Sequence, residues 1–531
     1  MTIEHHQAIP DNTPLLIGAG QYTEHLPSSG EGPLNSPVEL AARAARLAIE
    51  SAGGSLTGSD IDAIATIRLF SDSAPAWACP FGRSDNPPAS IARRIGARPN
   101  WNIYSNAGGD QPLCLLAEFS GAIARGEIEC ALLTSTEAIA NQRHAQKHGL
   151  QPDWNEEMGQ EGLDERKYIK RMVTPEELAS GMYLPAHWYA LIENFRATQQ
   201  GNTPQQHLQQ MAELLAPMSQ VAASNPYAFF PTGYSAQELA GNNNGNYPIC
   251  LPFSKRLVAQ DAVNQAAAVV IISAGKAREL GIEPEHWILQ LGYAEGEDLP
   301  LIKRKNPGTS EAMERVFDTA IASAGIKQED IELIDIYSCF PCAVESARDT
   351  LGISREDSRP LTVTGGLPFF GGPGNAYSMH ALAEMVLRLR SGFRTAMITA
   401  NGGMLSKHAA VILGANNGSN RDKALDFTRL QPKAIDPTDI EAVKICEVPV
   451  SGKVLSYTVI HERKGDDTAI VLARTDEGER FLAYNSDAEI VSQVMAASPV
   501  GRAIAVKQVD GRNHFGFSTS SVEKQQSARA S

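Results

Sequence analysis

A segment order that occurs twice is the feature of this sequence that most limits its fold. Residues 45–64 contain a helical pattern, the triplet Ser-Ala-Gly and a short apolar stretch, and residues 316–335 repeat this order. Residues 123–135 contain a helix end, a glycine and an apolar run, and residues 389–400 repeat that order as well. We therefore predict two copies of one α/β unit, which bury their sheets against shared helices in a layered core.

Two further parts interrupt or follow this repeat. Residues 138–252 are irregular and rich in Gln, Asn, Gly and Pro, with amphipathic pieces, which indicates a mainly helical insertion in the first half. From about residue 421, short β-rich stretches alternate with turns, which is typical of a five-stranded barrel of the oligonucleotide/oligosaccharide-binding (OB) type, although a sandwich also fits. The 531 residues are too many for one core, and the predicted units are 1–275 (first half, with the insertion 138–252), 276–420 (second half), 421–517 (barrel) and 518–531 (flexible tail).

Charge and composition exclude several classes of function. The net charge is -15 and no long Lys/Arg run interrupts the acidic balance, so neither nucleic acid nor an anionic membrane surface is an expected partner. No apolar stretch reaches the roughly 18 residues that a membrane span needs, and the first ten residues lack a basic-then-apolar pattern. The seven cysteines form an odd, scattered set that favours free thiols. A cytoplasmic location is expected.

Cys339 and Cys342 are the one close cysteine pair in the chain, at a Cys-x-x-Cys spacing. Zinc binding or redox chemistry at this spacing needs a second ligand pair or a helix start, and the sequence indicates neither. No metal site is therefore expected.

The duplicated halves, the long insertion and a Gly-Gly-Pro-Gly-Asn turn at residues 371–375 together resemble the thiolase superfamily over residues 14–414. The chain is most similar to thiolase-like proteins related to the sterol-carrier type, with an extra C-terminal domain. The resemblance implies a duplicated thiolase fold with α/β/α/β/α layers. It also implies a coenzyme A (CoA) ester as substrate or ligand, no tightly bound cofactor, and a homodimer, because thiolases usually pair through a central strand.

Three catalytic elements of the family are altered in this chain. Asn106 occupies the position of the cysteine nucleophile, and an amide cannot form an acyl-enzyme. Gly372 replaces the histidine of the Gly-His-Pro turn, and the Cys-x-Gly loop is replaced by residues 399–404, which contain no cysteine. Thiolase turnover needs the nucleophile, imidazole and proton-shuttling thiol as one unit, so this reaction is not expected.

One further residue of the family site is kept in this chain, and another candidate residue lies outside the family motifs. Tyr337, Ser338, Cys339 and Phe340 follow an apolar stretch in place of the His-Asp-Cys-Phe motif, so Cys339 is a candidate catalytic thiol. His408, ahead of a predicted strand, is a candidate partner for it. The helix starts after the two Gly-rich turns are expected to direct amides into the cavity between the halves. The expected ligand-binding or oxyanion-binding residues are Tyr337, Ser338, Gly372, Asn375, Gly402 and Gly403.

Three classes of function follow from these residues. The first is an acyl-CoA-handling enzyme, acetyl-CoA acetyltransferase-like at family level, which uses Cys339 and His408 in a changed mechanism. The second is a non-catalytic protein that binds acyl-CoA or lipid. The third is a scaffold whose C-terminal barrel docks onto a partner enzyme.

Overall fold

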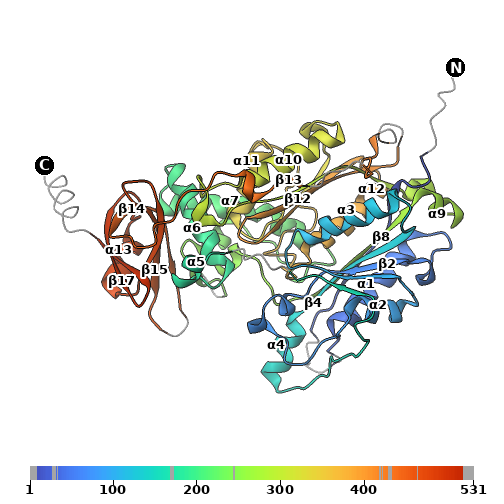
Figure 1. The fold of residues 1–531 in the computed structure, drawn as a ribbon, viewed down its shortest axis with the longest axis horizontal. Helices are drawn as coiled ribbons and strands as arrows, with labels where there is room; N and C mark the ends of the chain where they lie inside the picture. Colours follow the sequence, from blue (N-terminus) through green and yellow to red (C-terminus); the bar gives the residue numbers. More distant parts are fainter. Residues whose placement is uncertain are drawn as a thin grey trace.

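The computed structural model has an elongated shape, with a large α/β body at one end and a small barrel at the other (Figure 1). Among its described residues no helix is both long and apolar enough to cross a membrane. The structure describes residues 9–26, 32, 34–167, 173–242, 245–417, 420, 423–428, 433–462 and 465–517.

The first half forms a five-stranded mixed sheet. Its strand order is β1 (Pro14–Thr23), β8 (Asn264–Ser273), β4 (Cys130–Ala138), β2 (Ala63–Thr66) and β3 (Trp101–Tyr104). The β1–β8 and β8–β4 pairs are antiparallel, whereas β4–β2 and β2–β3 are parallel.

The second half repeats this pattern of pairing. Its strands follow the order β9 (Ile288–Glu297), β12 (Lys407–Ala415), β11 (Thr395–Gly402) and β10 (Leu333–Asp335). The first two pairs are antiparallel and the β11–β10 pair is parallel, as in the first half. A short β1–β9 pairing joins the two halves. The predicted duplication is confirmed.

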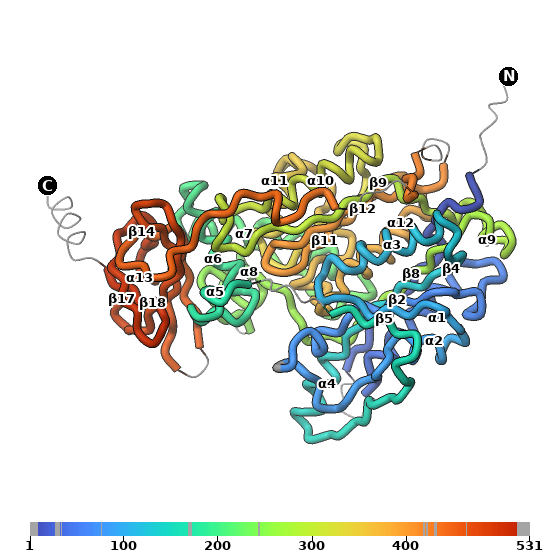
Figure 2. The backbone as a smooth tube through the Cα atoms, in the orientation of Figure 1, coloured from blue at the N-terminus to red at the C-terminus, as the bar shows by residue number. Residues whose placement is uncertain are grey.

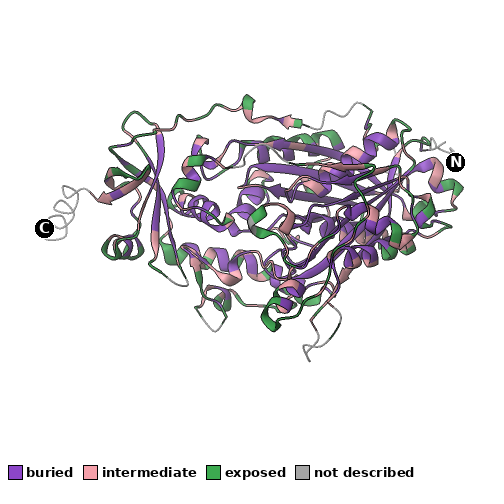
Figure 3. Ribbon diagram, turned by 60° about the horizontal axis from the view of Figure 1, so that its bottom comes forward, coloured by how far each residue is buried: buried purple, intermediate pink, exposed green. Residues whose placement is uncertain are grey.

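Helices complete the layers on both sides of these sheets. Helices α3 (Gln111–Ala124) and α12 (Tyr377–Arg390) lie between the halves and contact strands of both, whereas α1 (Pro37–Ala52) and α10 (Glu311–Ala324) cover the outer faces. Successive residues of β8 pack alternately into the two hydrophobic cores on either side of the sheet, because neighbouring side chains of a strand point to opposite faces. Burial is concentrated in the sheets and central helices (Figure 3). The remaining helices of the body are α2 (Pro87–Ile95), α9 (Ala274–Glu279) and α11 (Pro341–Thr350).

The two short parallel strands begin later than the sequence suggests. Strands were predicted to begin at Asp60 and Asp330, but both residues lie in 3-10 turns. The Asp60 carboxylate accepts a hydrogen bond from the Thr57 amide at 2.9 Å, and Asp330 accepts one from Lys327 at 3.1 Å. These side-chain contacts satisfy backbone amides locally, so each strand starts three or more residues later.

The insertion is mainly helical, as predicted, and two of its short strands pair outside it. Strand β5 (Leu163–Glu165) runs parallel to β3 and covers the outer edge of the first sheet (Figure 2). Strands β6 (Pro248–Cys250) and β7 (Phe253–Ser254) extend the barrel sheet. The helices are α4 (Ile139–His148), α5 (Pro175–Ala179), α6 (Pro185–Gln199), α7 (Pro204–Ser224) and α8 (Ala236–Ala240).

The C-terminal part is a closed five-stranded barrel. Its strands pair in the order β14-β15-β16-β18-β17, and β17 pairs back to β14. A helix between the third and fourth strands and a parallel β16–β18 contact make it OB-like, so the alternative of a sandwich is wrong. The β-rich stretches in the sequence are residues 454–460, 468–473, 481–484 and 503–509, so the last strand and the helix were not predicted. The elements are β14 (Ser451–Ile460), β15 (Thr468–Arg474), β16 (Arg480–Asn485), α13 (Ala488–Ala496), β17 (Ala503–Val509) and β18 (Arg512–Phe517).

The barrel packs on the body through buried polar contacts. The segment 433–450 runs across the body to the barrel, beginning with β13 (Lys433–Ile435), which pairs with β9 (Figure 2). The hydroxyl of Ser456 donates to the Leu191 carbonyl at 2.6 Å, and the Asn194 side chain donates to the Tyr457 carbonyl at 2.8 Å. These contacts fix β14 against α6.

Candidate functional site

The turn between β3 and α3 carries Asn106, which the sequence resemblance predicts at the position of the family nucleophile. Asn106 is half-buried and borders a cavity of about 450 Å³. The Ser105 hydroxyl is directed elsewhere, since it accepts from the Arg68 amide at 2.9 Å and donates to the Asn106 carbonyl at 2.7 Å. Asn106 therefore borders the cavity, and Ser105 is held by other contacts.

Cys114, on the helix that follows this turn, borders the same cavity and is half-buried. Its thiol donates a weak hydrogen bond to Asp110 Oδ2 at 3.7 Å. Burial, together with the carboxylates of Glu295 and Asp110, raises the pKa of Cys114 well above its usual value. The thiol is therefore protonated at neutral pH and is a weak nucleophile.

Asn375 holds the turn from the second half. Its Oδ1 accepts a hydrogen bond from the Gly108 amide at 3.0 Å, and its Nδ2 donates to the Arg68 carbonyl at 2.9 Å and to Ser73 Oγ at 3.1 Å. The Gly108 amide, which was expected to face a ligand, is thus bound by a side chain. Asn375 bridges the two halves.

Asp110 fills the space beside this turn. Glycine is required at positions 108 and 402, because a Cβ at either would lie 2.1 or 2.2 Å from Asp110 Oδ1. This oxygen is buried and makes no hydrogen bond to any described residue. Gly402 therefore makes room for the Asp110 carboxylate, and its ligand-binding role stays a prediction.

Cys339 lies behind a lid of aromatic side chains. Its sulfur accepts a hydrogen bond from Asn401 Nδ2 at 3.5 Å, and the same amide donates to the Tyr189 hydroxyl at 2.8 Å. Tyr189, from α6 of the insertion, stacks on Phe340 with ring centroids 4.2 Å apart. Burial raises the pKa of Cys339 to about 11, so its thiolate fraction at neutral pH is small.

His408 and Cys339 are not joined by a hydrogen bond. The His408 imidazole contacts Ser310 Oγ at 3.0 Å and the Leu405 carbonyl at 3.2 Å, on the α10 side of the sheet. Burial lowers the pKa of His408 to about 4, so it is neutral at pH 7. It borders the 450 Å³ cavity, but its ring is held by these other partners.

The other sequence-predicted residues have mainly structural contacts. The Tyr337 hydroxyl lies beside Gly109, where a Cβ would be only 2.4 Å away. Ser338 Oγ accepts from the Leu367 amide at 3.1 Å, and the Gly372 amide donates to the Gln260 carbonyl at 2.7 Å. The Gly403 carbonyl accepts a hydrogen bond of 3.4 Å from the Tyr189 hydroxyl.

The Cys339–Cys342 pair does lie at a helix start, which the sequence analysis did not predict. Helix α11 begins at Pro341, so Cys342 is in its first turn. Burial raises the pKa of both thiols, that of Cys342 well above its usual value. The helix start therefore does not produce a reactive pair.

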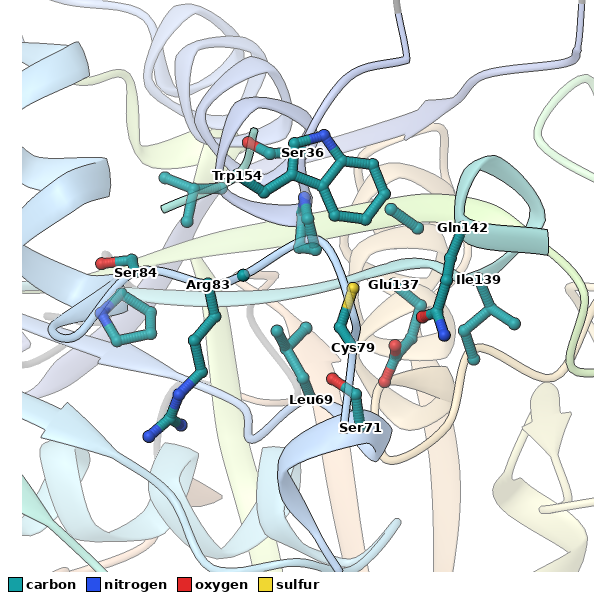
Figure 4. A pocket seen from close by; sticks show the side chains of 15 residues that line it. Ser36, Leu69, Ser71, Cys79, Arg83, Ser84, Glu137, Ile139, Gln142 and Trp154 are labelled. Atoms are coloured by element: carbon teal, nitrogen blue, oxygen red, sulfur yellow. The ribbon is translucent and has the colours of Figure 1, made fainter. Parts of the chain in front are cut away.

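A second, smaller cavity is lined by residues of the first half (Figure 4). Cys79, Glu137 and Trp154 line it, and its volume of about 20 Å³ admits about one water molecule. The Glu137 carboxylate accepts a hydrogen bond from the Phe70 amide at 2.6 Å, and burial raises its pKa to about 8. This space is too small for a substrate.

Comparisons with known proteins agree with this geometry. Residues 432–512 match the family model described as the thiolase-like protein type 1 additional C-terminal domain. The crystal structure of a monomeric SCP2-thiolase-like protein type 1 from Mycobacterium smegmatis is 31% identical, covers 96% of this chain and 100% of its own, and has a TM-score of 0.78. The chain belongs to the SCP2-thiolase-like protein type 1 family. The predicted resemblance, including the extra C-terminal domain, is confirmed.

More distant structures share the fold alone. An Ltp2-ChsH2(DUF35) aldolase is 18% identical, with 78% of this chain and 100% of the other covered and a TM-score of 0.55. An acetyl-CoA acetyltransferase from Syntrophomonas wolfei is 17% identical, with 76% and 99% covered and a TM-score of 0.53. No curated protein matches the chain.

Several residues of the site were not found from the sequence. Tyr189 lies in the predicted insertion, and the sequence of the insertion gives no signal that it would reach Cys339. Asn401 stood within a loop noted only for its missing cysteine. Lys407 and Arg166, which border the large cavity, have no motif around them.

Proposed function

We propose that this thiolase-like protein binds a CoA ester and does not transfer its acyl group. The family fold supports the ligand class, and one observation supports the absence of transfer. Asn106, at the start of α3, borders a cavity of about 450 Å³ from the position where an acyl-enzyme would form. An amide cannot form that intermediate.

The surrounding contacts support the same proposal. The Gly108 amide, in the turn before α3, is bound by Asn375 at 3.0 Å and so is not free to stabilise an oxyanion. The Asp110 carboxylate next to it opposes any second negative charge at the helix start. The site therefore lacks a nucleophile, and the stabilisation of a negatively charged transition state is weakened.

An acyltransferase that uses Cys339 and His408 has less support. Cys339 is covered by Tyr189 and Phe340, and the His408 ring is bound to Ser310. A thiol with a pKa of about 11 and no imidazole partner is a poor nucleophile.

The proposal is tested by binding and mass measurements on the same preparation. Isothermal titration calorimetry with acetyl-CoA is expected to show binding, and intact-protein mass spectrometry after incubation with acetyl-CoA is expected to show no added mass. Turnover of acetoacetyl-CoA with CoA that is lost in Cys339→Ala would support the acyltransferase instead. An acyl adduct on any cysteine would overturn the proposal. Absence of binding would do so as well.

We propose further that the protein is a monomer that acts in the cytoplasm. The relative from Mycobacterium smegmatis is described as monomeric. Strand β5 covers the edge of β3 in this chain, which opposes the homodimer expected from the sequence. All seven cysteines are free, which agrees with a reducing compartment.

A scaffold role for the barrel is a second candidate. Val448 and Val450, on the segment that leads into β14, are 65% and 74% exposed. Such side chains favour contact with a partner protein, and a partner that co-purifies with the intact chain but not with a Val448→Ser, Val450→Ser variant would support this role.

A further inference from the structure

Most of the lining of the 450 Å³ cavity beside Asn106 comes from three elements. Helix α3 contributes Asp110, Cys114 and Glu118, which lie one above another at a spacing of four residues. Strand β9 contributes Tyr293, Glu295 and Glu297, which alternate along the strand and so share one face, and β12 contributes Lys407. The cavity therefore extends from the position of the lost nucleophile along α3.

Charged side chains dominate these walls, and acids and bases are equal in number. Arg166 forms two hydrogen bonds to Glu118, at 2.6 and 2.7 Å, and the Tyr293 hydroxyl donates to Glu295 at 2.8 Å. The ionisable Asp, Glu, Lys and Arg residues of the lining are Asp110, Glu118, Glu295, Glu297, Arg125, Arg166, Lys407 and Lys433.

An aliphatic chain is unfavourable in such a space. The volume is large enough for a chain of medium length, since ligand pockets commonly span roughly 300–1,000 Å³. A hydrocarbon chain would remove water from the charged groups and give them no hydrogen bond in return. The chemistry of the walls, and not the volume, therefore limits the ligand.

Lys407 brings a buried cation close to Asn106. Only 4% of its surface is exposed, and its Nζ lies 3.4 Å from the carbonyl of Ala107, the residue after Asn106. Lys407 points toward α3, whereas the next residue, His408, points toward α10, because neighbouring strand residues face opposite ways. Lys407 thus places an ammonium group beside position 106.

We infer that this cavity holds a short acyl group that carries a hydroxyl, and that it disfavours unbranched aliphatic acyl chains. A hydroxyl both donates and accepts hydrogen bonds, so it can accept from Lys407 and donate to a carboxylate such as Glu295. This inference rests on the proposed binding of a CoA ester, and it names the acyl class that the same site takes.

The affinities of four compounds test the inference in the full-length protein. Calorimetry is carried out with CoA, butyryl-CoA, 3-hydroxybutyryl-CoA and octanoyl-CoA. The hydroxylated ester is expected to bind about tenfold or more tightly than butyryl-CoA, because buried polar groups lose their partners when the hydroxyl is absent. Octanoyl-CoA is expected to bind no more tightly than butyryl-CoA.

The possible failures can be told apart. Equal affinities for the two four-carbon esters, or tighter binding of octanoyl-CoA, would overturn the inference and leave the proposed function intact. If none of the CoA compounds binds, the proposed function and the inference fail together.

Two lysine variants locate the preference within the cavity. Lys407→Met is expected to reduce the ratio of hydroxybutyryl to butyryl affinity by about tenfold, whereas Lys327→Met, outside the cavity and 78% exposed, serves as the matched control with an unchanged ratio. Thermal unfolding of both variants shows whether they fold. An unchanged ratio in a folded Lys407→Met protein would contradict the role of Lys407, and the wild-type ratios test the acyl class independently of any variant.

Discussion

Glu137 shows how single buried groups support the Gly-rich turns around the site. Its carboxylate lies beneath Gly374, whose φ is 53° and where a Cβ would be 2.4 Å from Glu137 Oε1. Only glycine fits both the left-handed backbone and this close approach. Since Gly374 precedes Asn375, the Glu137 carboxylate helps to place the side chain that holds the start of α3.

The stability of the protein is expected to fall with rising pH because of Glu137. Burial raises the pKa of its carboxyl from about 4.5 to about 8, so between these values the folded state keeps a proton that the unfolded state releases. The free energy of unfolding therefore decreases from pH 4.5 up to pH 8 and levels off above it, with at most about 1.4 kcal/mol per pH unit from one group. Glu137→Gln keeps the acceptor for Phe70 and removes this dependence.

Urea unfolding between pH 6 and pH 8.5 measures this effect. From the lower to the higher pH of that window, the free energy of unfolding of Glu137→Gln is expected to rise by on the order of 2 kcal/mol relative to that of the wild type. The pKa of Asp335 is raised only to about 6, so it contributes mainly below the window. Glu127→Gln, whose carboxyl is fully exposed, is the control, and a Glu137→Gln profile parallel to the wild-type profile would show that Glu137 is ionised when folded.

At the scale of elements, helix α6 of the insertion is what closes the site. The Tyr189 hydroxyl accepts hydrogen bonds from Asn401 Nδ2 at 2.8 Å and from the Leu405 amide at 2.9 Å. Leu405 has a φ of 55°, which a leucine adopts only at some cost. Tyr189 therefore fixes the β11–β12 hairpin in the conformation that covers Cys339.

Removal of this hydroxyl is expected to destabilise the hairpin and to expose the thiol. Tyr189→Phe leaves two buried donors without their acceptor, which costs about 1–3 kcal/mol of unfolding free energy. Urea unfolding measures the loss, and alkylation of Cys339 by iodoacetamide is expected to become faster. Tyr183→Phe is the matched control, because that residue is 67% exposed and its change should stay within about 0.5 kcal/mol. Equal unfolding curves for the two variants would mean that the lid does not depend on Tyr189.

The sequence predicted the helices and strands better than it predicted the contacts between them. Helix and strand periodicity identified both halves and four barrel strands, since these patterns are local. The last barrel strand, Arg512–Phe517, was missed because Gly and Asn weaken its pattern. The proposal that Asn106 stands at the nucleophile position comes from a motif, which is local in the sequence. The direction of His408 could not be predicted, because it depends on strand register, and the contact of Tyr189 with Asn401 joins residues 212 positions apart.

At the scale of the whole molecule, the edge strands of the sheet decide how the chain associates with other chains. An exposed strand edge offers unpaired amides and carbonyls to another chain. Strand β5 pairs in parallel with β3, and the adjacent Arg166 amide donates to the Tyr104 carbonyl at 2.9 Å. The Arg166 side chain then binds Glu118 of α3 at 2.6 Å, which holds this cover against the body. The edge of β3 is thus closed from within the chain.

The protein is therefore expected to remain a monomer over a wide range of concentration. Size-exclusion chromatography with light scattering from about 1 to 100 μM is expected to give a constant mass near 57.1 kDa. Arg166→Pro removes both the amide donor and the ion pair and is expected to free the β3 edge, so its mass should rise with concentration. Arg166→Lys is the control, because it keeps the backbone amide and should stay monomeric. A wild-type mass near twice the monomer value would show that another surface mediates pairing and that the covered edge does not determine the assembly.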